Sequence, residues 1–328
     1  IFRSGNLQNV ISLDANSLES VEVLFGPGAV MYGSDAIGGV MDFTTKTGKY
    51  SIDSVKPMIR TNLFSRYSSV NNEVTSHADF NYGAKKWAFA TAASYSQFGD
   101  LKTGKHGDSF FLRPTYQAGA IDDPQMIENS DPSRQVHSGY SQMNALQKIQ
   151  FKPSEKNEFI YGFTYSKTSE APRYDRLVQD KDGNDTLDYY QWFYGPQKWM
   201  MNRLTWLNSN KNFFYDHLRI TLAQQSYSES RHDVKFGSTS IRRQYERVGI
   251  GSMNTDFEKE IGTRASFAYG VEYVYNKVNS YAQRELLNGD AMEINPRYPD
   301  GATWQSVGAY TNLEYKINEK MSFHTGLR

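Results

Sequence analysis

Residues 20–46 read S-V-E-V-L-F-G-P-G-A-V-M-Y-G-S-D-A-I-G-G-V-M-D-F-T-T-K, and this stretch decides the fold. Its first apolar run, residues 21–24, predicts a short strand, and the Gly-Pro-Gly sequence at 26–28 predicts a turn. A brief helical piece is expected over residues 29–32, followed by a second strand over residues 40–45. Glycines between the two strands allow another backbone to approach closely. The alternative interpretation is an ordinary glycine-punctuated strand pair of any compact domain.

The order of these positions is similar to the end of one particular domain. The stretch resembles the end of the plug of TonB-dependent outer-membrane transporters, and a long series of ordered positions makes this more specific than a short motif. One departure is Phe25, because family members commonly carry a basic residue there. This departure leaves the plug-to-barrel ion pair of that residue in question. The positions that carry the resemblance are Glu22, Gly26, Pro27, Tyr32, Gly33, Gly38 and Gly39.

The composition excludes several classes of protein. The chain has 328 residues with 36 basic and 36 acidic side chains, so its balanced charge does not favour nucleic acid as a partner. No run reaches the 18 or more apolar residues of a spanning helix. Aromatic residues nevertheless make up 14% of a chain that contains no cysteine and has a mean hydropathy of −0.66. This mixture is typical of a barrel that is apolar only on alternate residues and carries aromatic girdles.

Bulky and small residues alternate along much of the chain after residue 50. In residues 87–95 the bulky positions Trp87, Phe89 and Tyr95 share one face, whereas alanines and a serine fill the other. Residues 159–166 and 267–275 repeat the pattern, and residues 74–82 and 307–317 show it more weakly. A period of two predicts strands. It does not by itself distinguish a membrane barrel from a soluble sandwich.

The connections between these strands support the barrel. Short connections are expected at residues 83–85, 152–157, 208–212, 258–263 and 317–320. Longer ones are expected at residues 67–72, 100–135, 169–196, 228–244 and 279–303. This alternation is typical of outer-membrane barrels, which have tight periplasmic turns and large extracellular loops. The predicted fold is therefore all-β, an antiparallel transmembrane β-barrel with an N-terminal α+β plug fragment.

The domain boundaries follow from this fold. Residues 1–50 are expected to be the C-terminal part of the plug domain, and residues 51–328 the N-terminal half of the barrel. Plugged transporters of this class close at about 22 strands. Half a barrel would leave two bare edges, so the natural polypeptide is expected to be longer, with a signal peptide and a TonB box outside this chain.

One loop has the oxygen-rich pattern of a calcium site. Residues 180–191 resemble an EF-hand loop, with Asp185 in place of its glycine and Gln191 in place of its bidentate glutamate. Calcium is therefore a candidate structural ion, and no cofactor is required. A solvated acidic turn is the alternative interpretation. The candidate ligands are Asp180, Asp182, Asn184, Asp188 and the carbonyl oxygen of Thr186.

Other residues are candidates for ligand contact. Loop aromatics can bury a large area at little entropic cost, although they can equally pack loops together or form the upper girdle. These aromatics are Tyr116, Tyr174, Tyr189, Tyr190, Trp192 and Tyr194. In the plug, Arg3, Asn6 and Gln8 lie in a polar stretch that could form an apical loop. By strand parity His77 is expected to face the lumen. No catalytic constellation appears, so an enzyme is not expected.

The resemblance implies a function. It implies a receptor in the bacterial cell outer membrane that takes up a scarce nutrient, with energy from TonB acting through a segment absent here. Haem or a ferric chelate is the small-molecule ligand that it implies first, with cobalamin, oligosaccharides and peptides left open. A surface adhesion or docking barrel that binds a protein partner without transport is the rival hypothesis. A passive porin is disfavoured by the plug sequence.

Overall fold

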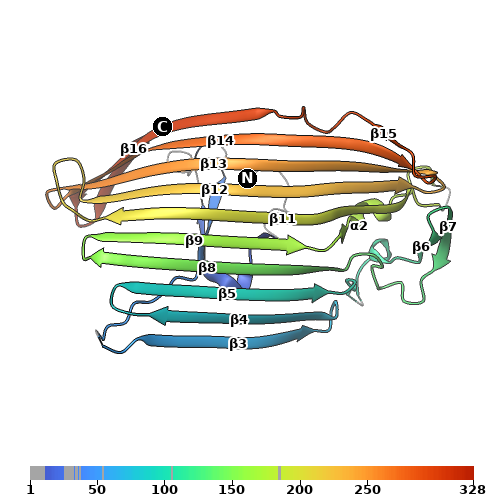
Figure 1. The fold of residues 1–328 in the computed structure, drawn as a ribbon, viewed down its shortest axis with the longest axis horizontal. Helices are drawn as coiled ribbons and strands as arrows, with labels where there is room; N and C mark the ends of the chain where they lie inside the picture. The colour runs from blue at the N-terminus through green and yellow to red at the C-terminus, as the bar shows by residue number, and fades with distance from the viewer. Residues whose placement is uncertain are drawn as a thin grey trace.

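The computed structural model describes residues 12–25, 33, 36, 38–53, 55–104, 106–183 and 186–328. Most of these residues form one antiparallel sheet. Its long strands are β3 (Met58–Ser68), β4 (Glu73–Gly83), β5 (Trp87–Phe98), β8 (Tyr140–Ser154), β9 (Asn157–Thr168), β11 (Tyr189–Asn208), β12 (His217–Lys235), β13 (Ser240–Ile261), β14 (Ala265–Leu286), β16 (Thr303–Asn318) and β17 (Met321–Leu327). Each pairs with the next long strand along the chain, so that β3 and β17 form the two edges (Figure 1).

Each strand of this sheet has an outer and an inner face. On β5 the side chains alternate between exposed and buried, with Trp87 43% and Tyr95 51% exposed but Ala88 fully buried. The alternation predicted for residues 87–95 is therefore confirmed. On β5 the inner face carries small residues, which leaves room beside this strand for a domain inside the curved sheet.

Aromatic residues gather on the outer face near the short turns. The Trp87 and Phe151 rings stack with their centroids 4.3 Å apart, and Phe257 and Tyr269 stack at 4.8 Å. Such aromatics are typical of one interface of a membrane barrel. Within the described ranges, no helix has the length and apolar character needed to cross a membrane.

The predicted plug strands form a separate two-stranded ribbon. β1 (Leu18–Phe25) pairs antiparallel with β2 (Gly39–Thr45), and the 3-10 helix η2 (Ala15–Ser17) precedes β1. The ribbon lies behind the central strands in Figure 1. The expected boundary after residue 50 falls in the connection between β2 and β3. The helical piece expected over residues 29–32 lies outside the described residues.

The glycines of the predicted plug motif differ in their surroundings. At Gly39, φ is +149° and an added Cβ would lie 2.6 Å from the carbonyl oxygen of Leu24, so the close backbone approach is confirmed there. Gly38 was expected to share this role; an added Cβ there meets no described atom within 4 Å, and the preceding residues 26–32 lie outside the described ranges, so its role stays a prediction. Gly33 has φ +95°, a conformation that favours glycine.

Three of the predicted long connections are shorter than expected. Residues 228–244 were expected to be a loop, but β12 continues to Lys235 and β13 begins at Ser240. Likewise β14 continues to Leu286, and only four residues, 69–72, separate β3 from β4. Polar side chains do not prevent strand pairing where they interact with side chains on the neighbouring strand. Arg242 and Asp233, for example, lie directly opposite each other with Nε 2.8 Å from Oδ1.

The remaining long connections carry structure of their own. Residues 99–139 contain the 3-10 helix η3 (Ser109–Phe111) and a hairpin of β6 (Thr115–Ala120) and β7 (Asp123–Glu128). Residues 169–188 contain β10 (Ala171–Pro172) and the helix α2 (Tyr174–Leu177). Another short strand, β15 (Ala291–Glu293), pairs with β14. These elements lie together at one end of the sheet (Figure 1).

Candidate functional site

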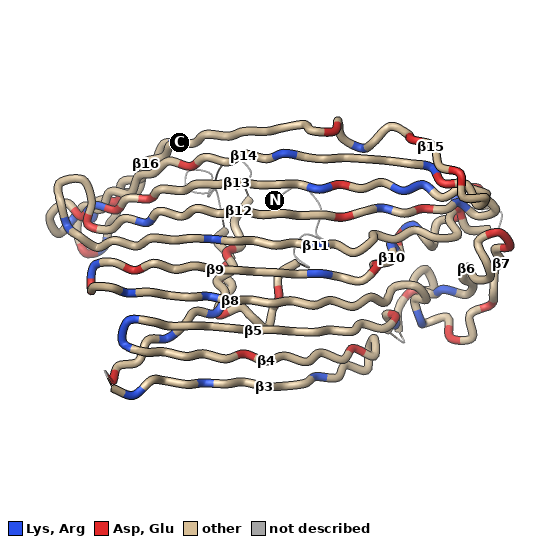
Figure 2. Tube along the Cα trace, in the orientation of Figure 1, with Lys and Arg blue, Asp and Glu red and all other residues tan. Residues whose placement is uncertain are grey.

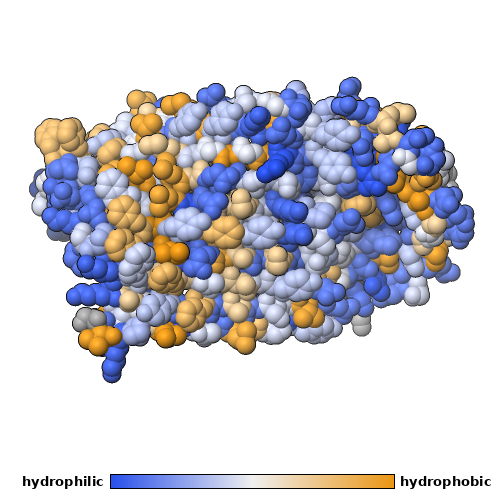
Figure 3. All heavy atoms as spheres, in the orientation of Figure 1, coloured by the Kyte–Doolittle hydropathy of each residue, from blue (hydrophilic) through white to orange (hydrophobic). Residues whose placement is uncertain are grey.

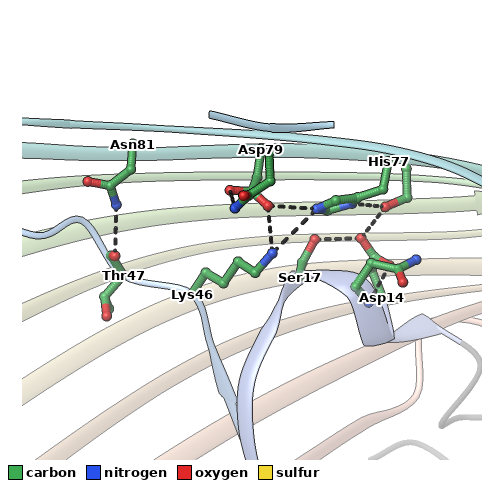
Figure 4. A network of polar contacts seen from close by, with 10 residues as sticks. Asp14, Ser17, Lys46, Thr47, His77, Asp79 and Asn81 are labelled. Carbon is green, nitrogen blue, oxygen red and sulfur yellow. Dashed lines mark hydrogen bonds and ion pairs between the residues drawn. The ribbon is translucent and has the colours of Figure 1, made fainter. Parts of the chain in front are cut away.

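Both ends of the plug ribbon are fastened to the inner face of the barrel sheet. Asp14 lies just before β1 and caps η2 by accepting a hydrogen bond from the backbone N–H of Asn16 at 3.0 Å. Lys46 follows β2 directly. Lys46 meets Asp79 and His77 on β4, and Asp14 meets Ser94 on the neighbouring strand β5, all through side chains that strand parity directs inward (Figure 4). We call Asp14, Lys46, His77, Asp79 and Ser94 the plug network.

The centre of the plug network is His77, which is 1% exposed. Its Nδ1 lies 2.6 Å from Oγ of Ser94, and its Nε2 lies 3.1 Å from Oδ2 of Asp79. Ser94 donates to Oδ2 of Asp14 at 2.7 Å, and Lys46 donates to Oδ2 of Asp79 at 2.7 Å. The prediction that His77 faces the lumen is confirmed, and the residue contacts the plug there.

Hydrogen-bond counting constrains the protons of the plug network. A carboxylate can only accept, so the single hydroxyl proton of Ser94 goes to Asp14. The Nδ1 atom of His77 must then carry a proton and donate it to Ser94. The Nε2 atom of His77 lies 3.1 Å from Oδ2 of Asp79 and 3.4 Å from Nζ of Lys46, so the ring connects the ion pair of Lys46 and Asp79 with the Asp14 end of the ribbon.

Backbone contacts continue the attachment after β2. The Nζ of Lys148 on β8 donates to the carbonyl oxygen of Thr45 at 2.7 Å, and Nδ2 of Asn81 donates to that of Thr47 at 3.1 Å. Tyr50 donates its hydroxyl to Oε1 of Glu158 on β9 at 3.0 Å. Burial and the charge of Glu158 raise the pKa of the Tyr50 hydroxyl, so this donor keeps its proton at neutral pH.

Glycine packing brings the connection after β2 close to the wall. An added Cβ at Gly83 would lie 1.9 Å from the carbonyl oxygen of Lys49, and one at Gly48 would lie 2.8 Å from Cβ of Ala88. Gly83 ends β4 and Gly48 lies in the connection after β2, so these two glycines mark places where the connection closely approaches the wall.

Replacing Gly83 with alanine is therefore expected to displace the connection and weaken plug docking by about 2 kcal/mol, the usual range for overpacking. Hydrogen exchange of residues 39–50 in the full-length protein would measure it. Gly251→Ala is the matched control, because an added Cβ there meets no described atom within 4 Å. Equal protection in the two variants would contradict the prediction.

A second group of contacts joins the long loops at the opposite end. We call Arg113, Gln117, Tyr174, Leu177 and Trp192 the loop cluster. Gln117, 1% exposed, donates its amide to the carbonyl oxygens of Leu177 at 2.7 Å and Tyr189 at 2.6 Å, and accepts from Nη2 of Arg113 at 2.6 Å. Burial lowers the pKa of the Arg113 guanidinium, which lies 5.1 Å from the centre of the Tyr174 ring.

The predicted ligand-contacting aromatics contribute mainly to this packing. Tyr190 and Trp192 are 8% and 6% exposed, and Tyr194 is also buried. Tyr190 donates its hydroxyl to the carbonyl oxygen of Gly119 at 2.8 Å. Tyr116, Tyr174 and Tyr189 are partly exposed. Of the predicted aromatics, these three keep surface for a ligand, and ligand contact by any of them stays a prediction.

The predicted calcium ligands differ in their contacts and exposure. Asp180 accepts from the backbone N–H of Gly183 at 2.8 Å, and Asp188 accepts from that of Lys181 at 3.2 Å, so both carboxylates support the turn itself. Asp182 is exposed and Thr186 is partly exposed. No group of three acidic or histidine residues in the described ranges is arranged to hold a metal. Asn184 lies outside those ranges, and calcium binding stays a prediction.

Several predicted residues lie outside the described ranges, namely Arg3, Asn6, Gln8, Gly26, Pro27 and Tyr32. Glu22 is exposed on β1, directly opposite Asp42. The sequence reasoning missed Asp14, Lys46 and Asp79, because nothing local indicates their partners. It also missed Phe110 and Phe111, which lie in η3 and are 83% and 52% exposed. An apolar pair inside an otherwise polar loop was the available signal for them.

Comparison with known proteins agrees with this architecture. Residues 3–40 match the family described as TonB-dependent Receptor Plug Domain. The fold is similar to that of the copper transporter OprC, with a TM-score of 0.68 and 12% identity over 96% of this chain and 42% of that one. It is also similar to the FrpB iron transporter from Neisseria meningitidis, F3-3 variant, with a TM-score of 0.63 and 14% identity over 96% and 52%.

A third similar structure is a double mutant of the Serratia marcescens hemophore receptor HasR in complex with its hemophore HasA and heme. Its TM-score is 0.65, with 12% identity over 96% of this chain and 39% of that one. The chain thus spans about half the length of the solved structures it matches. No curated protein sequence matches it significantly.

The class that the fold and the plug motif define is that of plugged outer-membrane barrels. Residues 3–40 match the plug-domain family of TonB-dependent receptors, and the rest of the described chain has the fold of the barrels in the similar solved structures. The proteins it matches are transporters and receptors rather than enzymes.

Proposed function

We propose that the complete protein is a TonB-dependent receptor in the bacterial outer membrane that takes up an iron-containing small molecule, either haem or a ferric chelate. The plug network carries this proposal. A folded ribbon attached to the inner face of the sheet obstructs the lumen, and passage through an obstructed lumen needs an external energy source. Side chains that hold the ribbon by hydrogen bonds and one ion pair permit release without covalent change.

The solved relatives support the substrate class. Their names refer to iron, to copper and to a hemophore with heme. At the loop end of this chain, the partly exposed Tyr116, Tyr174 and Tyr189, with the more exposed Phe110 and Phe111, offer aromatic surface to a flat or aromatic ligand. TonB would act as the partner that supplies the energy.

Uptake by the full-length protein tests the proposal. We expect a bacterial strain that lacks its own iron receptors to grow on haem or on a ferric chelate when it produces this protein, and to stop growing when TonB is deleted. A spectral titration distinguishes the two ligands, because haem binding at micromolar concentration shifts the Soret band.

Each negative result of this test excludes a different part of the proposal. An unchanged Soret band would remove haem and leave the ferric chelate. Growth that no iron source supports would remove iron uptake. In that case, a full-length sequence without a TonB box would favour the surface docking barrel, which has no use for coupling to TonB.

A further inference from the structure

One arginine faces the lumen without a carboxylate partner. Arg203 lies on β11 beside Leu204, which is 47% exposed on the outer face, so strand parity directs Arg203 inward. Figure 3 shows that outer face, on which apolar residues concentrate toward the short-turn end. Among the described residues, Arg203 takes part in no ion pair. Its guanidinium, which is partly exposed, can therefore pair with an anion that enters the lumen.

The wall around Arg203 is otherwise neutral. Arg203 lies opposite Gly162 on β9 and Ala223 on β12, and the same row continues to Ser252 on β13. At the next inward positions toward either end, these four strands carry only isoleucine, threonine, methionine, glutamine and asparagine. A lone guanidinium in a neutral wall determines the electrostatic potential of that part of the lumen.

A second cation lies in the same row. Lys148 on β8 is opposite Gly162, which is opposite Arg203, so the glycine separates the two cations. Figure 2 shows a basic position on β8 and another on β11 at this level, on either side of β9. An added Cβ at Gly162 would meet no atom closer than Cγ of Lys148 at 3.9 Å, so the space over the glycine is open. We call Lys148, Gly162 and Arg203 the lumen recess.

The plug ribbon occupies one of these two cations. Nζ of Lys148, a residue that is 3% exposed, donates to the carbonyl oxygen of Thr45 at 2.7 Å. A carbonyl accepts this bond but carries no charge to balance the ammonium. The carboxylate of Glu19, also on the ribbon, acts electrostatically on Lys148 and accepts from Oγ1 of Thr47 at 2.9 Å. When the ribbon withdraws, both acceptors leave, and Lys148 faces the recess together with Arg203.

Carboxylates on the wall near the lumen recess already have partners. On β9, Glu158 accepts hydrogen bonds from two side chains. On β13, Asp256 lies opposite Arg219 and accepts from a tyrosine hydroxyl at 2.7 Å. On β14, Glu272 is paired with Arg328. Arg219 adds further positive charge near the recess, so the recess keeps an excess of positive charge once the ribbon has moved.

We propose that the lumen recess is a step on the path of a negatively charged ligand past the plug. A carboxylate or phenolate oxygen of the ligand takes the place of the Thr45 carbonyl at Lys148 and pairs with Arg203. The ligand therefore passes on the β11 side of the ribbon, whose contacts go to β4, β5, β8 and β9. The recess favours haem, through its carboxylates, and anionic ferric chelates over neutral chelates. This inference rests on the proposed function and names the charge of its ligand.

Uptake of labelled iron by cells that produce the full-length protein tests the role of Arg203. The probes are haem, an anionic ferric tris-catecholate and a neutral ferric trihydroxamate. We expect Arg203→Gln to lower the uptake rate of the anionic probes about tenfold, the effect of roughly one ion pair in a wet lumen. Arg203→Lys should retain most of the uptake. Binding of the same probes to cells without energy should stay unchanged, because the recess lies beside the ribbon rather than among the loops.

Arg247→Gln is the matched control, because Arg247 is exposed on β13 and has the same outward parity as Met253, which is 44% exposed. Lys148 is left unchanged, because it also holds the ribbon. Unchanged uptake in Arg203→Gln would overturn the proposal, as would an equal loss of probe binding and uptake. Uptake of the neutral trihydroxamate as fast as that of the anionic probes would do the same.

An electrical measurement separates this inference from the proposed function. The full-length protein is inserted into a planar bilayer, and urea loosens the plug until ions pass. In a potassium chloride gradient, we expect Arg203→Glu to shift the reversal potential toward cation selectivity, whereas Arg247→Glu leaves it unchanged. No shift in Arg203→Glu would overturn the inference even if the natural protein takes up iron. A shift in a protein that takes up no iron would remove the proposed function and retain the recess.

Discussion

An Asp79→Asn variant of the full-length receptor will hold its plug ribbon less firmly, by about 3 kcal/mol. The carboxylate of Asp79 accepts from Nζ of Lys46 at 2.7 Å and from Nδ2 of Asn62 at 3.0 Å, and it lies 3.1 Å from Nε2 of His77. An amide has the same shape but no charge. The amide oxygen can replace one of the two carboxylate oxygens as an acceptor. The amide N–H groups then face the donors that the other carboxylate oxygen accepted from.

The loss is larger than that of an exposed ion pair. The side chain of Asp79 is 12% exposed and that of His77 is fully buried, so water cannot fully replace the missing charge. Lys46 is 31% exposed, which limits the cost of leaving it unpaired. Because Asp79 joins Lys46 and His77, its substitution weakens the attachment at both ends of the ribbon.

Hydrogen exchange in the full-length protein measures this effect, since local opening sets the exchange rate of protected amides. We expect residues 18–25 and 39–45 to exchange about a hundredfold faster in the variant. Glu155→Gln is the control, because it removes an ion pair with Lys152 at 3.1 Å from an exposed turn far from the plug. If the ribbon amides exchange at the same rate in both variants, the plug network does not hold the plug.

The plug strands and the direction of the barrel side chains could be predicted from the sequence because both depend on local order. Residues 21–24 are a short apolar run and residues 40–45 alternate in character after a glycine pair, and they lie in β1 and β2. The period of two fixes the parity of a strand, so the inward direction of His77 followed from residues 74–82 alone. Its partners Asp14 and Lys46 are distant in the chain, and no local pattern indicates which inward residue they meet.

The ends of the strands on the loop side could not be predicted. The aromatic pattern ends at the edge of the lipid, whereas the pairing between strands continues beyond it. β12 and β13 continue beyond this point through polar pairs such as Arg242 and Asp233. The same limitation affected Tyr190 and Trp192. They were expected in a long loop, but they belong to β11, where the loop cluster covers them. Composition identifies an aromatic residue as one that favours packing contacts. Only its position in the paired strands shows which surface it packs against.

The loop cluster leads to the prediction with the largest expected effect. In a Gln117→Ala variant, the carbonyl oxygens of Leu177 and Tyr189 and the Nη2 of Arg113 each lose a partner inside the packed loops. A buried polar group left without its partner costs about 1 to 3 kcal/mol, so three of them together should cost about 4 kcal/mol after some entry of water. The hairpin of β6 and β7 would then separate from α2 and β11. We expect limited proteolysis of the full-length protein to cut residues 99–139 several hundredfold faster.

Gln125→Ala is the matched control for this substitution, because Gln125 is exposed on the neighbouring strand β7 and its amide reaches only Asp123 among the described residues, at 3.3 Å. Proteolysis of that variant should match the natural protein. If Gln117→Ala and Gln125→Ala are cut at the same rate, buried amide contacts do not hold the loops. If instead the loops open in Gln117→Ala and ligand affinity falls with them, the partly exposed Tyr116, Tyr174 and Tyr189 depend on the loop cluster for their position. The ligand surface is then set by residues that never contact the ligand.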